Sequence, residues 1–205
     1  QVTPAPGPLN IILVDTLNTP ANLVAVAQQQ IVQYLRTMPP GTQVAIFRLS
    51  GVGLQVLQGF TSDRDLLLRA MDTNFLAFSS NTEGIRRRWL TLDALDQIAS
   101  YLTGIKGRKN LLWFVPGMPV HLTRDGGYGG QALPGNSIRN STVNIDLTLV
   151  HRLMDTYERF TAEQIAISPI DPRPISPSRN IRIALTNLYA QDVAQATGGV
   201  AYYNN

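Results

Sequence analysis

The chain has 205 residues, enough for one sizeable α/β domain, and contains no cysteine, which excludes disulfides, thiol catalysis and thiolate metal sites. It is 44% hydrophobic and 15% charged with a formal net charge of +3, a composition typical of globular proteins. Basic residues are scattered except in the short runs 86–88 and 106–109, so we expect no nucleic-acid partner. No apolar run approaches the roughly 20 residues needed to cross a bilayer, so we expect no membrane insertion.

The first eight residues differ in character from the rest of the chain. Residues 1–8 (QVTPAPGP) are rich in proline and lack the charged and apolar regions of a signal peptide, so we expect an extended linker. From residue 9 to residue 205, strand and helix patterns alternate without an internal repeat or a break. This stretch is therefore predicted to form one domain.

The stretch Leu9–Thr19 (LNIILVDTLNT) is the element around which the chain is organised. Asn10–Val14 is apolar on both faces and rich in β-branched residues, which predicts a central strand of a parallel sheet with helices on both sides. The run stops at Asp15, a single carboxylate followed by turn-forming residues. Because ligands of open α/β sheets gather at the carboxyl ends of the strands, we expect function to centre on Asp15.

The elements that follow can be placed by hydrophobic periodicity and by turn residues. A Gly-Val-Gly turn at residues 51–53 predicts a hairpin, and therefore an antiparallel edge strand. We expect five helices: one from Thr19-Pro20 to the Pro39 region, one beginning after the cap Thr61-Ser62-Asp63, one from Thr91 to about residue 103, one at about 146–161, and one that ends at Thr197. We expect further strands at 43–49, 54–57, 110–115, 165–170 and 200–203.

This order predicts an α/β fold with a doubly wound, mostly parallel central sheet, one antiparallel edge strand and helices on both faces. The connections from helix to strand are short, whereas the long stretches 72–88, 116–145 and 171–182 gather at the carboxyl end of the sheet. Loops longer than about 12 residues in compact domains are usually functional or disordered. We therefore expect the carboxyl end of the sheet to be the working face.

Three stretches in this order resemble a known family. ILVDTLNT, TLDALDQIASYLTGIKGRKNLLWFVPG and QATGGVAYYN are similar to segments of a von Willebrand factor type A domain, and more narrowly to the A-domain-related proteins described from acidobacteria. The resemblance runs from about Leu9 to Asn204. It implies a von Willebrand A-like fold, in agreement with the fold class predicted from spacing.

The resemblance also implies a metal-ion-dependent adhesion site. In that site an aspartate and two hydroxyl residues of the first loop, a threonine of a second loop and an aspartate after the fourth strand hold Mg²⁺, and a partner's carboxylate completes the oxygen ligands that a hard ion prefers. Asp15 occupies the aspartate position and Thr19 the second hydroxyl position. Thr91 is the nearest candidate for the second-loop threonine, ahead of Thr82. The candidate metal ligands are therefore Asp15, Thr19 and Thr91.

Two positions depart from the pattern of the family. Leu17 stands where the first hydroxyl should be, and leucine cannot ligate a metal. Val115-Pro116-Gly117 replaces the usual Thr-Asp-Gly, so the fourth-strand aspartate is missing. Losing a carboxylate removes charge that would offset the dehydration of Mg²⁺. The site is therefore predicted to be degenerate and to bind divalent ions weakly, at roughly millimolar concentration or about 4 kcal/mol.

Each candidate ligand also has a structural interpretation, which stays open from the sequence alone. Asp15 could accept hydrogen bonds from backbone N–H groups at the start of the following helix, where the helix dipole favours a carboxylate. Thr19 and Thr91 could each be the N-cap of a helix. Asn18 could supply an oxygen ligand in place of the lost hydroxyl, or could simply be a turn residue.

No set of residues in the sequence has the pattern of an active site. His121 and His151 have neither metal-ligand spacing nor an accompanying nucleophile turn. Asp93, Asp96 and Asp171 fall on a helix surface and in a loop, where carboxylates are common. We therefore predict that the protein is not an enzyme.

Two function classes follow from these observations. The favoured one is a non-enzymatic protein-binding module for adhesion or assembly, which recognises a partner through the loops at the carboxyl end of the sheet. The alternative is an enzyme or small-ligand-binding domain that uses the crevice near Asp15. The resemblance and the proline-rich leader predict an extracytoplasmic location, secreted or periplasmic.

Overall fold

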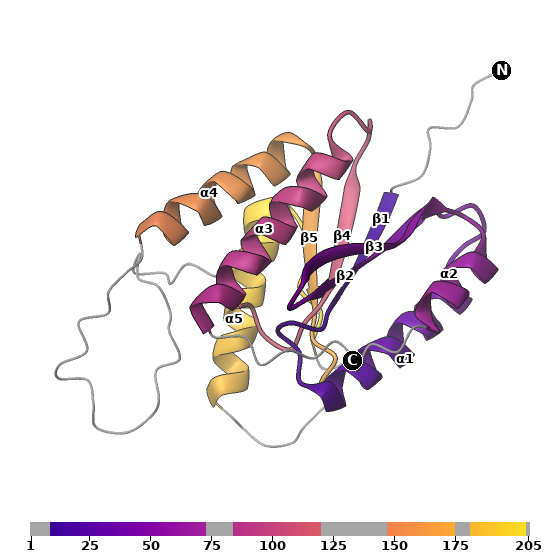
Figure 1. Ribbon diagram of the computed structural model, residues 1–205, viewed down its shortest axis with the longest axis horizontal. Helices are drawn as coiled ribbons and strands as arrows, with labels where there is room; N and C mark the ends of the chain where they lie inside the picture. Colours follow the sequence, from indigo (N-terminus) through magenta and orange to yellow (C-terminus); the bar gives the residue numbers. More distant parts are fainter. Residues whose placement is uncertain (1–8, 73–83, 120–146, 175–180, 204–205) are drawn as a thin grey trace.

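The computed structural model describes residues 9–72, 84–119, 147–174 and 181–203, and these form one five-stranded sheet with helices on both faces (Figure 1). The strands and helices alternate along the chain, as the hydrophobic pattern predicts. In chain order the elements are β1 (Leu9–Asp15), α1 (Ala21–Thr37), β2 (Val44–Ser50), β3 (Gly53–Thr61), α2 (Arg64–Met71), α3 (Gly84–Leu102), β4 (Lys109–Phe114), α4 (Leu147–Ala162), β5 (Ile165–Ile170) and α5 (Ile181–Thr197).

The sheet has the strand order β3-β2-β1-β4-β5. β1 pairs in parallel with β2 and β4, β5 pairs in parallel with β4, and only β3 is antiparallel to its neighbour β2. Ile12 lies opposite Ile46 on one side and Leu112 on the other, so β1 is central, as predicted. The doubly wound, mostly parallel sheet with one antiparallel edge strand is confirmed.

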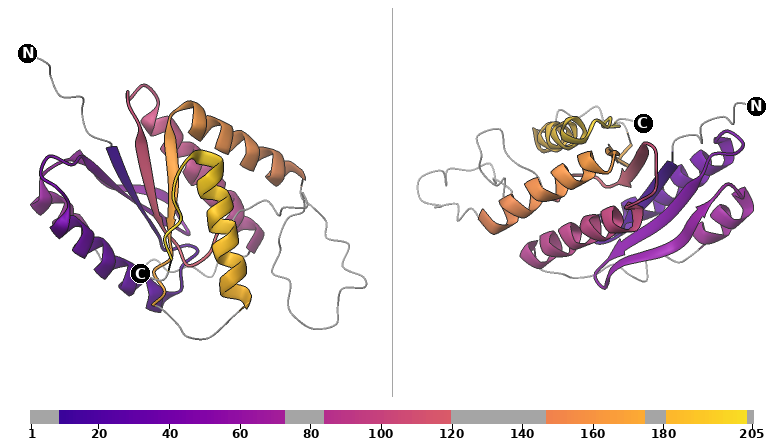
Figure 2. Two further views of the ribbon diagram at one scale, coloured as in Figure 1. Left: turned by 180° about the vertical axis from the view of Figure 1, so that it is seen from behind. Right: turned by 90° about the horizontal axis from the view of Figure 1, so that it is seen from above.

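Alternate residues of the strands bury against two separate layers of helices. One core lies between the sheet and α1 and α2, with Ile12, Val14 and Ile46 among its fully buried residues. The other lies between the sheet and α3, α4 and α5 and includes Leu13 and Trp113. Figure 2 shows α5 running alongside β5. Because β1 is buried on both faces, its side chains are apolar at almost every position.

Of the N-caps predicted for α1 and α2, the one for α2 is confirmed and the one for α1 is wrong. Asp63 caps α2 as predicted, because its carboxylate accepts hydrogen bonds from the backbone N–H groups of Asp65 and Leu66. The prediction that Thr19 caps α1 is wrong. The N-cap of α1 is Pro20, and no side chain caps this helix. Thr19 lies one residue before the capping position, and its side chain is buried.

The prediction that Thr91 is an N-cap is also wrong, because α3 begins two turns earlier, at Gly84. Arginine and leucine have good helix propensity, so the segment Gly84–Leu90 continues the helix that the periodicity predicted only from Thr91 onward. Thr91 therefore lies within the helix, fully buried, and its hydroxyl donates to the carbonyl oxygen of Arg87.

The predicted closing strand at 200–203 is wrong as a strand, since it shortens to a single parallel bridge between Ile170 and Tyr202. The chain reaches β5 through a very close approach of backbone to backbone. A Cβ atom at Gly199 would lie 1.9 Å from the carbonyl oxygen of Ile167, so only glycine fits there. Two backbone hydrogen bonds of 2.8 Å, from Tyr202 N–H to the oxygen of Pro169 and from Asp171 N–H to the oxygen of Tyr202, hold the C-terminal segment against β5.

The topology brings several elements together at one end of the sheet. β1, β2, β4 and β5 all end there, and α3 begins there. The strand order reverses between β1 and β4, which makes the crevice between their carboxyl ends the expected ligand site of such a sheet. The predicted loops 72–88, 116–145 and 171–182 lead from or into this end, but their residues 73–83, 120–145 and 175–180 lie outside the described residues.

Candidate functional site

Asp15 is the last residue of β1, and its side chain lies on the α3 side of the sheet. The strand alternates its faces, so Asp15 follows Ile11 and Leu13 toward the core that contains Trp113. The residue is only 1% exposed. A buried carboxylate requires compensation, because removing its charge from water is costly.

Three N–H donors provide that compensation. The backbone N–H of Asn18 donates to Oδ1 of Asp15 at 2.8 Å, and the side-chain amide of Asn18 donates to Oδ2 at 2.8 Å. The indole Nε1–H of Trp113 donates to the same Oδ2 at 3.0 Å. Burial raises the pKa of Asp15 from 3.8 to about 6, and the hydrogen bonds from Asn18 and Trp113 limit the rise. Asp15 therefore holds the first loop, one of the two roles considered from the sequence.

Asn18 joins this loop to α3. Its side-chain nitrogen donates to Oδ2 of Asp15 and also to Oγ1 of Thr91, the latter at 3.0 Å. An amide group has two hydrogens to donate, and each has a partner here. The structure therefore brings Asp15 and Thr91 together, as the resemblance predicted, but with a hydrogen-bond donor between them.

The side chains of Leu17 and Thr16 in the first loop make their contacts away from Asp15. Leu17 is 3% exposed and packs in the core on the α3 side. The hydroxyl of Thr16 donates to the carbonyl oxygen of Leu49 at 2.8 Å, which ties the loop to β2. Two buried oxygen atoms, Oγ1 of Thr19 and Oδ1 of Asn18, have no hydrogen-bond partner among the described residues.

These contacts do not fit a Mg²⁺ ion as they stand. Mg²⁺ requires about six oxygen ligands at 2.0–2.1 Å, several of them usually water, and the lone pairs of Asp15 are instead taken by nitrogen donors. Val115 and Pro116 follow β4 and supply no side-chain oxygen. In the described part of the chain, no three His, Cys, Asp or Glu side chains gather into a group that could hold a metal ion.

Two residues that donate hydrogen bonds to Asp15 are not evident as its partners from the sequence. The sequence predicts that Trp113 lies in a buried strand, but nothing in it shows that the indole faces the end of β1. The parallel pairing of Leu13 with Trp113 provides that contact. From the sequence, Asn18 is expected to be a turn residue or an oxygen ligand. In the structure its side-chain nitrogen instead donates hydrogen bonds to Asp15 and Thr91.

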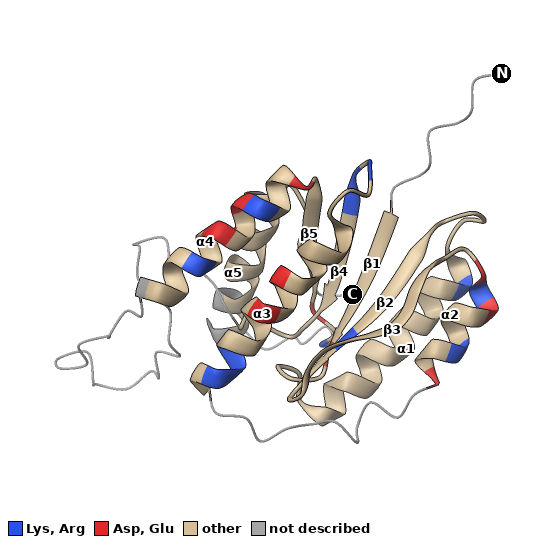
Figure 3. Ribbon diagram, turned by 45° about the horizontal axis from the view of Figure 1, so that its top comes forward, with Lys and Arg blue, Asp and Glu red and all other residues tan. Residues whose placement is uncertain are grey.

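The remaining candidate residues take structural roles elsewhere. Asp93 and Asp96 both pair with Arg152 of α4, which also lies over the ring of Trp89 at 5.3 Å, so this cluster joins α3 to α4. Figure 3 shows acidic and basic residues on α3 and α4. His151 is exposed on α4, and His121 lies outside the described residues.

Asp171 also has a structural role, because its carboxylate accepts hydrogen bonds from the backbone and the side chain of Arg173. It borders a cavity between β4, β5 and α5 with a volume of about 10 Å³. A cavity of that size holds about one water molecule. This cavity therefore has no room for a substrate.

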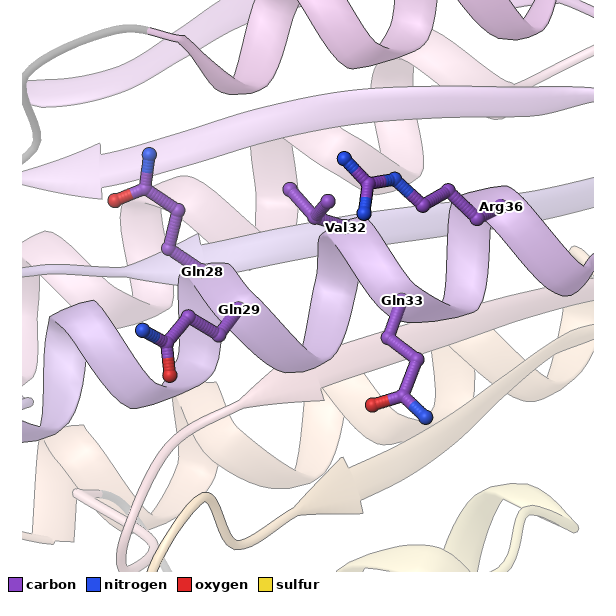
Figure 4. Close-up of a pocket in the computed structure, with 5 residues that line it drawn as sticks. All are labelled: Gln28, Gln29, Val32, Gln33 and Arg36. Atoms are coloured by element: carbon purple, nitrogen blue, oxygen red, sulfur yellow. The ribbon is translucent and has the colours of Figure 1, made fainter.

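A larger hollow lies on α1, away from the first loop. It has a volume of about 440 Å³ and is lined by Gln28, Gln29, Val32, Gln33 and Arg36 (Figure 4). These side chains come from one exposed helix face and include no carboxylate, hydroxyl or imidazole. The hollow is a shallow groove without catalytic groups, and the carboxyl end of the sheet remains the candidate site.

Comparison with known proteins identifies the fold. No family model and no curated protein sequence matches the chain. An aerotolerance-related membrane protein from Bacteroides fragilis is similar in structure, with a TM-score of 0.57, 14% identity, and coverage of 97% of this chain and 92% of that one. Proximal thread matrix protein 1 from the mussel byssus has a TM-score of 0.52 and 10% identity over 97% of this chain and 44% of its own.

Human COPII-coat protein Sec24c is similar over 95% of this chain and 29% of its own, with a TM-score of 0.51 and 13% identity. The VWA domain of SpRpn10 also matches, with a TM-score of 0.49 and 13% identity over 95% and 86% of the two chains. At such identities the likeness concerns the fold alone. The fold of the chain is von Willebrand A-like.

Proposed function

We propose that this domain is a non-enzymatic protein-binding module, for adhesion or assembly, that recognises a partner through the loops at the carboxyl end of its sheet. The observation that carries the proposal is the contrast between polar and apolar groups at that end. Asp15 and Thr91 are buried and satisfied by other residues of the chain, whereas large apolar side chains there are exposed. Such a surface suits contact with another protein better than it suits chemistry.

Three elements present these apolar side chains. Val52 is 77% exposed in the hairpin after β2, Ile85 is 55% exposed in the first turn of α3, and Tyr202 is 45% exposed beside the end of β5. All three elements meet the carboxyl end of the sheet. Arg86, also exposed, adds positive charge at the start of α3, which would favour an acidic region on the partner.

The similar structures support the proposal only through their fold and their names. One is a coat protein and another is a thread matrix protein. The narrower likeness to the acidobacterial A-domain-related proteins and the extracytoplasmic location are part of the same proposal. None of the helices in the described ranges is both long and apolar enough to cross a membrane.

The alternative is an enzyme or small-ligand-binding domain that uses the crevice near Asp15, and one observation favours it. Burial raises the pKa of Asp15 to about 6, and perturbed carboxylates gather at functional sites. However, N–H donors occupy both oxygens of this carboxylate, and the cavity between β4, β5 and α5 holds about one water molecule. A carboxylate in this environment is suited to stabilising a loop, which favours the binding module over this alternative.

Site-specific crosslinking tests the proposal. A photoreactive residue would be placed at Val52 or at Ile85, with Met154 as the control position, since Met154 is similarly exposed at 48% on α4. In the cells that make the protein, we expect the photoreactive residues at Val52 and at Ile85 to crosslink to the same polypeptide. We expect the one at Met154 not to crosslink to it. Binding of that purified polypeptide should weaken on Val52→Asp and should survive a chelator. Equal labelling from all three positions would refute the proposed surface.

A further inference from the structure

We propose that the side-chain nitrogen of Asn18 takes the place of a metal ion, so that the first loop is locked by an internal donor and needs no cation. This nitrogen lies 2.8 Å from Oδ2 of Asp15 and 3.0 Å from Oγ1 of Thr91. These are two of the positions at which the family resemblance places oxygen ligands. A group that carries partial positive charge therefore joins the same oxygens that an ion would join.

Neutral hydrogen-bond donors, and no cation, surround the carboxylate of Asp15 among the described residues. Asp15 is a buried carboxylate, and it accepts from the amide and the backbone N–H of Asn18 and from the indole of Trp113. Hydrogen bonds to a charged acceptor are stronger than those between neutral groups, so three of them offset much of the cost of burial. The leucine at position 17 fits this arrangement, because its side chain fills the core on the α3 side.

The orientation of the amide follows from its neighbours. If the amide were turned by half a rotation, Oδ1 of Asn18 would face the carboxylate oxygen of Asp15, and two acceptors would meet without a proton. The turned amide together with Asp15 and Thr91 would form an all-oxygen group. A cation could occupy the site only by selecting that turned state, at the cost of both side-chain hydrogen bonds of Asn18.

The oxygen ligand positions of the site are also closed to the outside, while Asn18 itself is partly exposed. Asp15 is 1% exposed, Thr91 is fully buried, and Thr19 is 6% exposed. A carboxylate from a partner could not reach a ligand position among these residues without opening the loop. Asn18 would hold the loop in this way whether or not a protein partner is found.

The test converts the internal donor into a ligand. Asn18→Asp places a second carboxylate beside Asp15, where the two would repel one another unless a cation bridges them. We expect this variant to lose about 5 °C or more in Tm in a chelator, and to regain most of the loss in a saturable way on addition of Mg²⁺ or Ca²⁺. Wild type should melt at the same temperature with a chelator and with 10 mM of either ion, so this proposal replaces the roughly millimolar binding expected from the sequence.

Asn22→Asp is the matched control, because Asn22 is exposed in the first turn of α1. Its Tm should not respond to divalent ions. If Asn18→Asp does not fold in chelator, refolding into 10 mM Mg²⁺ or Ca²⁺ is the readout, and recovery supports the proposal. A saturable rise in the Tm of wild type would overturn it, as would an Asn18→Asp variant that is fully stable in chelator or that no ion restores.

Discussion

Replacing Asp15 with asparagine isolates the free-energy cost of a buried carboxylate at the end of β1. The side chain is 1% exposed, and burial raises its pKa from 3.8 to about 6. A difference of about 2 pKa units between the unfolded and folded states corresponds to about 3 kcal/mol. Because the folded-state pKa is the higher one, the stabilising contribution is complete below about pH 4 and is lost as the pH rises through 6.

The quantity to measure is the difference in unfolding free energy between wild type and Asp15→Asn, from urea denaturation in chelator at pH 4 and at pH 7. The new amide would point an NH₂ group at N–H donors, but that constant cost cancels when the two differences are subtracted. We expect wild type to lose about 2.5 kcal/mol relative to the variant between pH 4 and pH 7. A difference that does not change with pH would refute the reasoning.

Three further substitutions test individual contacts. Gly199→Ala should destabilise the protein by about 3 kcal/mol or more in urea, because its Cβ would lie 1.9 Å from the backbone oxygen of Ile167; a cost below about 1 kcal/mol would contradict the close approach. Trp113→Phe removes an N–H donor from Asp15, so at pH 7 we expect a loss of about 1–3 kcal/mol that shrinks at pH 4; an equal loss at both pH values would show that only packing was changed. Arg152→Ala removes the ion pairs that join two carboxylates of α3 to α4. Because the guanidinium is partly exposed, we expect the free energy of unfolding in urea to fall by only about 1 kcal/mol, and by less with added salt.

The sheet was predictable because its central strands are apolar on both faces. Ile12 and its neighbours could only be buried, and the Gly-Val-Gly turn left β3 no partner except β2. The helix starts were less predictable, since they depend on contacts distant in sequence. Thr91 has the chemistry of an N-cap, yet the arginine-rich segment before it continues the helix and buries Thr91 against the first loop.

The candidate site was predictable in its position but not in its chemistry. The aspartate at the end of β1 and the threonine of α3 could be aligned with metal ligands, and the structure does bring them together. Sequence spacing cannot show whether oxygen or nitrogen of an asparagine faces a carboxylate, because that depends on the donors around it. The indole of Trp113 reaches Asp15 from a strand about a hundred residues away, a contact set by the pairing of β1 with β4.

The most direct test of the account is NMR of the N–H groups that surround Asp15. The indole resonance of Trp113, assigned with Trp113→Phe, and the side-chain amide pair of Asn18 would be followed as functions of pH and of Mg²⁺ concentration. Both groups donate to Oδ2 of Asp15, so we predict that they titrate together with a midpoint near pH 6. We also predict that, at pH 7, they stay in place up to 10 mM Mg²⁺. Saturable movement of the Asn18 amide at micromolar Mg²⁺ would mean that an ion, and not this amide, holds the loop.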